Sequence, residues 1–409
     1  MAGWRNWSGR LVAEPAAWRF VRSETDAAAC VAEAAQSGTP LRAVGASHSH
    51  AALVPTDGLL VDLSGLCGVV DCDSRTRRAR IWAGTPIYAL GRPLHDAGLA
   101  LENQGDIDRQ TLAGATATGT HGTGARLGSL SSRVVGARIA LATGEIVDCD
   151  SDRHPELFRA ARLHLGALGL VTQLVLQLRP AYRLRERAWL EPLGELLPRV
   201  PELCERHRHF EFFWFPQNDQ AFAKVSDETD DPAEYPLASE GQRCAWSYEV
   251  LANHRPDPHV EMEYSVPAAA GPDCLREVAE RLRRDFPDLA WPVEYRRVAA
   301  DDVWLSPAFE RDVATLSVHQ AAELDESDCF RACEEVFLRH GGRPHWGKLH
   351  GLDGTGLAAR HPAWPRWWSA RDACDPQGLF LNPTLRAWRE GGAGSSSEGT
   401  APGSAGASC

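Results

Sequence analysis

The sequence predicts an α+β protein of two domains, and three observations support this prediction. A chain of 409 residues is too long for one simple core. Before Pro180, short apolar strands alternate with helical segments, which is typical of α/β units. After Pro180, strands with alternating apolar residues are interleaved with two amphipathic helices. This second pattern predicts a large antiparallel sheet with helices on one face.

The first half opens with a predicted helix over residues 25–37, with Thr25 as its N-cap and Gly38 as its end. A buried strand over 41–44 follows and leads into a loop that contains glycine. Thr143 and Gly144 lie between two apolar segments and predict a hairpin. The other expected elements are strands over 59–63, 79–83, 134–142, 145–147 and 170–178, and helices over 87–97 and 154–165.

The second half carries a different pattern. Residues 227–236 are acidic and polar, which predicts a surface loop. Residues 391–409 are rich in Gly, Ser and Ala without core-forming side chains, which predicts a disordered tail. The expected strands cover 184–190, 210–215, 260–266, 293–298 and 313–319, and the expected helices cover 275–286 and 327–339.

Composition excludes several classes of protein. The formal net charge of −12 argues against a nucleic-acid partner, because phosphate binding needs a basic face. No apolar run approaches the ~20 residues of a membrane helix, and residues 1–10 lack the apolar core of a signal peptide. We therefore expect a cytoplasmic protein without a membrane partner, whose oligomeric state stays open.

Cysteine and histidine spacing gives no sign of a metal centre. The eleven cysteines include no Cys-x-x-Cys pair, which predicts reduced structural thiols. His48 and His50 alternate on a loop, but no third ligand is in register with them. The sequence therefore predicts no metal site.

The most informative stretch is QGDIDRQTLAGATATGTHGTG, residues 104–124. Its small residues let the backbone approach a ligand closely, and free N–H groups can then donate to phosphate or carbonyl oxygens. A second loop of the same character, Gly45-Ala46-Ser47-His48-Ser49, follows the strand over 41–44. Both predict the walls of a large cofactor site. No Gly-x-Gly-x-x-Gly opens a helix after a strand, which argues against a nicotinamide enzyme.

Together the two loops resemble those of FAD-linked oxidases of the vanillyl-alcohol oxidase type, in the sugar-1,4-lactone oxidase (arabinonolactone and gulonolactone oxidase) and alditol oxidase branch. Residues 119–124 match the Gly-Thr-His-Gly-Thr/Ser-Gly of that branch residue for residue. The first loop differs, because Ser47 stands where the branch usually has Gly before the histidine. The resemblance extends to about Trp388.

The family fold implied by the resemblance has an FAD-binding domain of two subdomains (the PCMH type) and a substrate domain over the flavin ring. The substrate domain would hold the large antiparallel sheet with its flanking helices. The implied boundaries are 1–180 for the FAD domain, 181–350 for the substrate domain, 351–390 for a segment that returns to the FAD domain, and 391–409 for the tail.

The resemblance also implies a covalent 8α-histidyl bond between His48 and FAD. Taken alone, His48 could equally be a loop histidine that caps a carbonyl. The side chain of His121 can be a structural donor within its loop. The residues implied to bind the cofactor are Gly45, Ala46, Ser47, His48, Ser49, Gly105, Asp106, Gly114, Ala115, Thr118, Gly119, His121, Gly122, Gly169 and Val171.

Three polar residues of the second half are the candidate catalytic group. Alternation in the strand over 293–298 puts Glu294 and Arg296 on one face, where they are either a surface ion pair or a pair that binds hydroxyl groups. Lys348 follows His345-Trp346-Gly347, and in this apolar context we expect it in a site. The resemblance favours substrate binding by Glu294, Arg296 and Lys348, with His319 as a further pocket candidate.

The implied reaction oxidises a carbinol of a small polyhydroxylated substrate, an aldono-1,4-lactone or an alditol. Lys348, with its pKa lowered by Arg296 and burial, would accept the hydroxyl proton, and Glu294 would hold a neighbouring hydroxyl. Flavin N5 would take the hydride, and molecular oxygen would reoxidise the flavin with release of hydrogen peroxide. The alternatives are a dehydrogenase on the same scaffold, an oxidase of a more elaborate sugar alcohol, and a binder without activity. Glu261 and Glu263 share a strand face and are interpreted as structural.

Overall fold

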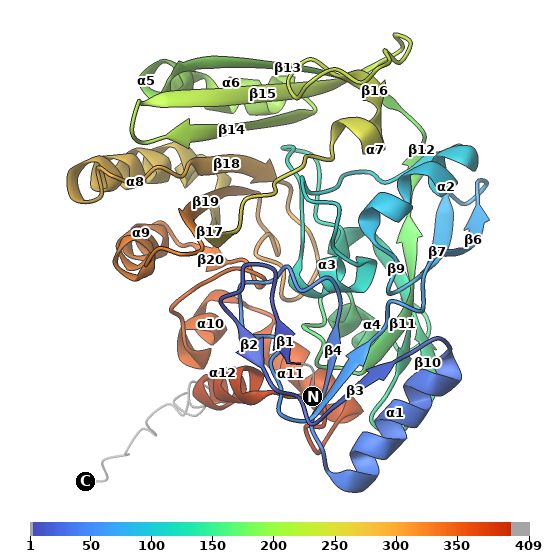
Figure 1. The fold of residues 1–409 in the computed structure, drawn as a ribbon. Coiled ribbons are helices and arrows are strands. Elements are labelled where there is room, and N and C mark those ends of the chain that lie inside the picture. Colours follow the sequence, from blue (N-terminus) through green and yellow to red (C-terminus); the bar gives the residue numbers. More distant parts are fainter. Residues whose placement is uncertain (1–2, 394–409) are drawn as a thin grey trace, which may run out of the picture.

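The computed structural model describes residues 3–393. Its two largest sheets lie in different parts of the molecule, an eight-stranded sheet at the top of Figure 1 and a five-stranded sheet below it. This arrangement confirms the predicted α+β class. The predicted site residues come from both parts.

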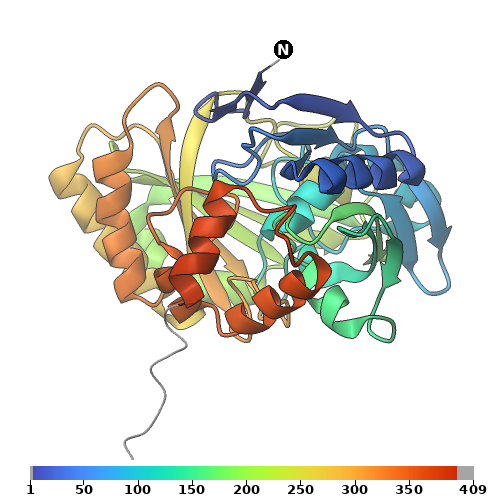
Figure 2. The same ribbon diagram turned by 90° about the horizontal axis from the view of Figure 1, so that it is seen from below.

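The eight-stranded sheet has the order β16-β13-β15-β14-β18-β19-β17-β20, and all of its pairs are antiparallel. Helices α8 and α9 pack against it and bury a core around Phe212, Tyr264 and Phe337 (Figure 2). The elements of this half are β13 (Arg183–Pro192), α5 (Leu193–Leu196), α6 (Val200–Arg206), β14 (His209–Phe215), β15 (Gln220–Thr229), β16 (Cys244–Trp246), α7 (Ser247–Val250), β17 (His259–Pro267), α8 (Gly271–Asp285), β18 (Val293–Val298), β19 (Val313–Ala321), α9 (Ser327–Arg339) and β20 (Arg343–Pro344).

The other half combines a parallel sheet β3-β5-β4 with an antiparallel sheet β10-β9-β11-β7-β6. Two short pairs, β1 with β2 and β8 with β12, complete it. Its elements are β1 (Trp4–Arg5), β2 (Val12–Ala13), β3 (Ala17–Phe20), α1 (Glu24–Ser37), β4 (Leu41–Val44), β5 (Leu59–Asp62), β6 (Val69–Asp73), β7 (Arg78–Trp82), α2 (Gly91–Asp96), β8 (Leu99–Ala100), α3 (Leu112–Thr118), β9 (Val134–Ala140), β10 (Ile146–Cys149), α4 (Pro155–Ala161), β11 (Leu170–Gln177) and β12 (Arg179–Pro180).

Local sequence signals explain the ends of several elements. Helix α1 ends at Gly38 as predicted, because this glycine takes the left-handed conformation (φ 65°). Its N-cap is Ser23 instead of Thr25, because Ser23 and Asp26 form a reciprocal capping box. The predicted hairpin is present, with β9 and β10 paired on either side of Thr143 and Gly144.

The segment from 104 to 124 is more ordered than predicted. Residues 112–118 form helix α3, whose N-cap is Thr111 and whose end is Gly119 with φ 79°. Alternate faces of a helix point in opposite directions, so part of this segment faces the protein core. Ala115, for example, is fully buried in the core of the lower half.

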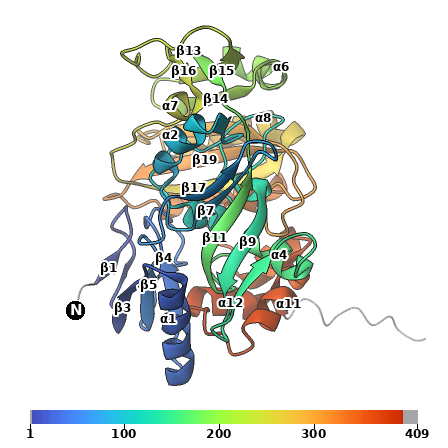
Figure 3. The ribbon, with the colours of Figure 1, turned by 90° about the vertical axis from the view of Figure 1, so that its right-hand side faces the viewer.

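Helices α10 (Gly354–Arg360), α11 (Trp364–Cys374) and α12 (Pro383–Ala393) belong to the lower half, where α11 packs against α4 and α10 packs against α11 and α12 (α11 and α12 are seen in Figure 3). Trp364, Trp367 and Leu385 belong to the same core as Leu174 of β11. The predicted tail begins too early, because its first three residues continue α12; the remaining residues, 394–409, lie outside the described part of the chain.

Two further predictions need correction. The acidic segment over 227–236 is only partly a loop, because β15 continues to Thr229 and pairs with β13. The helix expected over 154–165 ends at Ala161.

The ten cysteines of residues 3–393 are free, without a disulfide bond among them. Within the same residues, no helix has both the length and the apolar character needed to cross a membrane.

Candidate functional site

Two neighbouring cavities contain most of the predicted site residues. The larger, of about 370 Å³, lies between the eight-stranded sheet and residues 105–121 and is here called the charged cavity. The smaller, of about 100 Å³, lies between the loop 45–49, α3 and residues 164–171 and is called the small-residue cavity. Gln110 lines both, so the two cavities adjoin each other.

The loop 45–49 presents its backbone to the small-residue cavity. Within the described residues, the N–H groups of Ala46, Ser47, His48 and Ser49 have no hydrogen-bond acceptor. Ser47 has φ 58°, the left-handed conformation that glycine adopts most easily. Consecutive N–H groups around a left-handed residue form a concave site for an anion such as phosphate.

Ser47 can replace the usual glycine because a neighbouring strand supports it. Trp4 Nε1 donates to Ser47 Oγ at 3.0 Å, and Trp7 N donates to Ser47 O at 2.8 Å. Gly45 has no such freedom, because a Cβ there would lie 2.3 Å from Thr111 Oγ1. The loop therefore needs its glycine at 45 for close packing and tolerates a side chain at 47.

The residues predicted to bind the cofactor lie in different parts of the structure. Residues 45–49, Gly114, Thr118, Gly169 and Val171 line the small-residue cavity. Gly105, Asp106 and His121 line the charged cavity instead. Ala115, Gly119 and Gly122 line neither of these two cavities. Their small size has another cause: Ala115 packs in the core, Gly119 ends α3, and a Cβ on Gly122 would lie 2.2 Å from Gln104 O.

His48 lies where the N-terminal segment meets the loop. Its ring is 5.5 Å from the ring of Trp7. Burial, reinforced by the positive charge of Lys348, lowers the pKa of His48 to about 4. The imidazole is therefore neutral at neutral pH and carries a free lone pair on one nitrogen.

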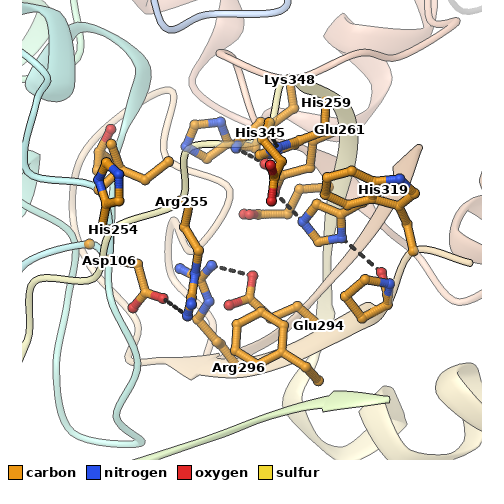
Figure 4. Close-up of a pocket in the computed structure, with 18 of the residues that line it drawn as sticks. Asp106, His254, Arg255, His259, Glu261, Glu294, Arg296, His319, His345 and Lys348 are labelled. Carbon is orange, nitrogen blue, oxygen red and sulfur yellow. Dashed lines mark hydrogen bonds and ion pairs between the residues drawn. The ribbon is translucent and has the colours of Figure 1, made fainter. Parts of the chain in front are cut away.

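Glu294 and Arg296 project from β18 into the charged cavity, as the strand alternation predicted (Figure 4). Arg296 donates to Glu294 through Nη2, and its Nε lies 3.9 Å from Glu211. Burial, opposed by Arg296 but aided by Glu211 and Asp106, raises the pKa of Glu294 to about 8. Glu294 Oε1 and Arg296 Nε are buried and have no hydrogen-bond partner in the described chain.

Lys348 lies in the same cavity as Arg296, and it is paired with a carboxylate that the sequence did not single out as its partner. Its Nζ donates to Glu261 of β17, whereas Arg296 is occupied by Glu294. The backbone explains this pairing: Leu349 N donates to Glu261 O at 2.9 Å, so this segment runs beside β17. Trp346 fixes the segment, since its fully buried indole donates to Leu305 O at 2.6 Å.

Histidines surround the carboxylate of Glu261. His319 Nε2 lies 3.7 Å from Glu261 Oε1, and its Nδ1 is 2.8 Å from Pro292 O. His259 lies on the same strand as Glu261, and the two rings of His259 and His319 are 5.5 Å apart. Burial disfavours the charge of Glu261, but Lys348 and His319 hold its pKa well below the ordinary value.

Glu263, two residues further along β17, holds His121. Their atoms Oε1 and Nε2 are 2.7 Å apart, and Ser317 Oγ donates to the other carboxylate oxygen at 3.0 Å. Both glutamates of β17 therefore line the charged cavity. The alternation of Glu261 and Glu263 predicted that both lie on one face of a strand. It did not indicate that this face points at the predicted site.

Asp106 is paired with a residue that the sequence did not single out. Its Oδ2 accepts from Arg255 Nη2 at 3.0 Å, and Arg255 also donates to Glu240 at 3.0 Å. Despite burial, Lys224 and Arg255 lower the pKa of Asp106 to about 2. Figure 4 shows this pair on the side of the cavity opposite His319 and Glu261. Asp106 thus faces the charged cavity instead of the small-residue cavity, because residues 103–106 precede α3 and run toward the eight-stranded sheet.

Two families match the sequence in its two parts. Residues 15–150 match the family described as FAD binding domain. Residues 174–244 and 235–388 match the family described as D-arabinono-1,4-lactone oxidase.

Curated relatives match along nearly the whole chain. L-gulono-1,4-lactone dehydrogenase of Mycobacterium tuberculosis is 35% identical and covers 94% of this chain and 98% of its own. L-gulonolactone oxidase of Bos taurus is 26% identical, and alditol oxidase of a Streptomyces species is 28% identical; each covers 93% of this chain and 97% of its own.

Solved structures share the fold at low sequence identity. A solvent-stable cholesterol oxidase superposes with a TM-score of 0.81 at 19% identity and covers 94% of this chain and 97% of its own. 6-hydroxy-D-nicotine oxidase from Arthrobacter nicotinovorans superposes with a TM-score of 0.74 at 20% identity and covers 92% and 93%. These likenesses show the fold alone.

Proposed function

Because the chain belongs to the D-arabinono-1,4-lactone oxidase family, we propose that it oxidises a carbinol of an aldono-1,4-lactone or an alditol. The matched FAD binding domain makes it an FAD-dependent oxidoreductase. The relatives named above act, by their names, on L-gulonolactone and on alditols, and these names supply the substrate class of the proposal.

The small-residue cavity fits the phosphates of FAD. Four N–H groups without acceptors, Ala46 to Ser49, supply donors for anionic oxygens, and a side chain on Gly45 would overlap Thr111. The adjoining charged cavity leaves room for the flavin ring and a small substrate, with Gln110 between the two. When bound, FAD supplies the hydride acceptor.

We also propose that His48 carries the flavin covalently. Its imidazole is neutral, lies beside the four free N–H groups, and faces the small-residue cavity from a loop that Trp4 and Trp7 hold in place. A neutral ring nitrogen is the form that can bond to carbon.

The observation that supports a polyhydroxylated substrate is that two buried atoms, Glu294 Oε1 and Arg296 Nε, have no hydrogen-bond partner in the described chain. Each such group costs roughly 1–3 kcal/mol if it stays unpaired. Hydroxyl groups of a polyol or lactone can pair with both, whereas a sterol or an aromatic alcohol offers a single hydroxyl. Glu294, protonated below about pH 8, can also donate a hydrogen bond to the substrate.

The proton chemistry belongs to Lys348 and Glu261. As hydride leaves the substrate carbon, Lys348 Nζ passes one of its protons to the carboxylate of Glu261 and takes the hydroxyl proton of the substrate in its place. The lysine thus stays charged, and Glu261 becomes neutral. Arg296 stabilises the negative charge that develops on the substrate oxygen.

We propose molecular oxygen as the electron acceptor, because the Bos taurus and Streptomyces relatives are named oxidases. Another acceptor is the second candidate, since the Mycobacterium tuberculosis relative, at 35% identity, is named a dehydrogenase. The two candidates share the substrate half-reaction and differ only in how the reduced flavin is reoxidised.

Anaerobic mixing of the holoenzyme with a panel of substrates tests the proposal. Aldono-1,4-lactones or alditols should bleach the flavin absorbance, and a panel in which only hydrophobic alcohols bleach it would contradict the substrate class. Admission of air then separates the acceptors: rapid recovery with hydrogen peroxide indicates oxygen, whereas slow recovery that a redox dye accelerates indicates a dehydrogenase.

A further inference from the structure

A cluster of ligand-type side chains, which the proposed reaction uses only in part, lies at one wall of the charged cavity; His259 and Glu261 line that wall, and His50 adjoins them. His50, His259 and Glu261 each offer one ligand atom, and these atoms all lie within 4.8 Å of one another. All three side chains are buried. No third ligand for His50 could be predicted from the sequence, because His259 and Glu261 lie more than 200 residues away and come close to it only in the folded chain.

The cluster has features that a chance meeting of polar residues lacks. His50 Nδ1 is buried without a hydrogen-bond partner, while its backbone is fixed by a bond from His50 N to Gly347 O at 2.7 Å. His259 Nδ1 lies 2.9 Å from Asp257 O. A hydrogen bond from Nδ1–H to this carbonyl leaves Nε2 as the free lone pair, as in histidines that ligate metals.

The chemistry of the three ligands selects a class of ion. Metal ions bind the neutral form of imidazole, and His50 and His259 supply two buried imidazoles. Two neutral imidazoles and one carboxylate suit Zn²⁺, whereas Mg²⁺ prefers oxygen ligands. With three protein ligands, a tetrahedral ion keeps one open position toward the cavity.

We propose that His50, His259 and Glu261 bind a zinc-class divalent cation and that this ion blocks the enzyme. The ion takes a carboxylate oxygen of Glu261, which otherwise pairs with Lys348. Bound there, it repels the ammonium group of Lys348 and occupies part of the cavity in which substrate binds. The binding of the ion is independent of the proposed function, but its competition with substrate rests on that function.

Titration of the holoenzyme with Zn²⁺ alone, followed by calorimetry, tests the site directly. One ion per chain should bind to the wild type, and Mg²⁺ should not bind there. His50→Ala and His259→Ala should each weaken this binding at least about tenfold. His254→Ala is the matched control, because His254 lines the same cavity outside the cluster, and it should bind Zn²⁺ like the wild type.

Stopped-flow reduction of the flavin tests the consequence. Zn²⁺ should raise the substrate concentration for half-saturation without lowering the limiting rate, and His50→Ala should remove this effect. Zinc binding that is unchanged in both His50→Ala and His259→Ala would overturn the proposal and assign the ion to another group, such as the exposed Cys67. Binding that needs both histidines but leaves half-saturation unchanged would overturn the blocking role alone. A protein that binds Zn²⁺ as expected but oxidises no lactone or alditol would contradict the proposed function and leave the metal site standing.

Discussion

The two adjoining cavities are built by different means. The small-residue cavity offers backbone N–H groups and glycine surfaces, which come mainly from three short stretches of sequence, the loop 45–49, α3 and residues 164–171. The charged cavity is lined by carboxylates, guanidinium groups, an ammonium group and imidazoles that come from three strands, β17, β18 and β19, and from several loops. A site formed by backbone groups can thus be predicted from short stretches of sequence. A site formed by side chains depends on how strands that are distant in the sequence are arranged in the fold.

The difference also separates what mutations should do in each cavity. In the small-residue cavity, adding a Cβ should disturb the site more than removing a functional group. A Cβ on Gly45, for example, would lie 2.3 Å from Thr111 Oγ1. In the charged cavity, each side chain compensates a neighbour, and removal of one leaves another unpaired. His48 is the exception in the small-residue cavity, since its proposed role depends on its side chain.

The largest effect is expected at this exception. His48→Ala should abolish covalent attachment of flavin, while the four N–H groups still hold FAD without a bond. Acid precipitation should leave wild-type flavin with the polypeptide and release the flavin of the variant into the supernatant. His50→Ala, changed two residues away on the same loop, should keep its flavin. Complete release of flavin from the wild type would make His48 a non-covalent neighbour of the cofactor.

In the charged cavity, Lys348→Met should have the largest effect on rate. The ammonium group meets a charge that develops only as the hydroxyl proton leaves, and loss of one such preorganised charge costs about 10²–10³ in rate. The limiting rate of flavin reduction should fall by that factor, with a smaller change in half-saturation. Glu261→Gln should reproduce much of the loss, since it removes the proton acceptor. A Lys348→Met variant with the wild-type limiting rate would remove Lys348 from the mechanism.

The same contrast explains how much the sequence could predict. The family resemblance and the FAD domain followed from the two glycine-containing loops, and the family matches confirm them. Strand β18, helix α9 and the hairpin between β9 and β10 followed from periodicity and turn chemistry. Cofactor binding by the residues that line the small-residue cavity stays a prediction.

The missed residues share one physical cause. The structure brings β17 and the loop before it beside β19 and residues 345–349, and only this arrangement places Glu261, Glu263 and Arg255 at the site. No spacing in the sequence pairs Arg255 with Asp106 or Lys348 with Glu261, because each pair joins segments at least 87 residues apart. Arg296 and Lys348 line the same cavity, as predicted, but each is paired with a carboxylate: Arg296 with Glu294 on its own strand and Lys348 with Glu261.

A smaller effect, on substrate affinity, is expected for the ion pair of Arg255 and Asp106, which lies across the charged cavity from Glu261. Arg255→Met leaves Asp106 without its hydrogen-bonded cation, whereas Glu240 keeps Lys224 at 2.9 Å, and it removes the contact of the guanidinium group with the ring of Phe213, 5.3 Å away. Half-saturation by substrate should rise about tenfold, which corresponds to loss of one charged hydrogen bond. The limiting rate should change little, since neither residue is assigned a proton.

Arg283→Met is a matched control for this variant. Arg283 pairs with Asp219 and lies 5.0 Å over the ring of Trp214, but it is not among the residues that line the charged cavity. It should leave half-saturation unchanged. Adding Asp106→Asn to Arg255→Met should recover part of the affinity, because it removes the unpaired carboxylate. Equal effects of Arg255→Met and Arg283→Met would exclude a direct role of Arg255 at the substrate.

The smallest effect at pH 7 is expected from Glu294→Gln. Because the pKa of Glu294 is about 8 in the folded protein, the residue is mainly neutral at pH 7, and glutamine resembles that neutral form. Half-saturation by substrate should therefore change by less than about threefold, the equivalent of under 1 kcal/mol. The control Glu205→Gln, which removes an exposed carboxylate at the end of α6, should have no effect.

The pH dependence of stability distinguishes this explanation from a merely tolerant site. The ordinary pKa of the glutamate is 4.5, so between pH 4.5 and about 8 the folded wild type holds a proton that the unfolded chain has lost. This contribution to stability is complete below pH 4.5 and is lost as pH rises to about 8, with a slope of at most about 1.4 kcal/mol per pH unit. The Glu294→Gln variant lacks the titrating group. Its free energy of unfolding should therefore increase relative to that of the wild type as pH rises from 4.5 to about 8. Urea denaturation of both holoenzymes at several pH values measures the difference. A difference that is constant from pH 5 to pH 8 would mean that Arg296 keeps Glu294 ionised throughout, and the proposed hydrogen-bond donation by Glu294 would then be wrong.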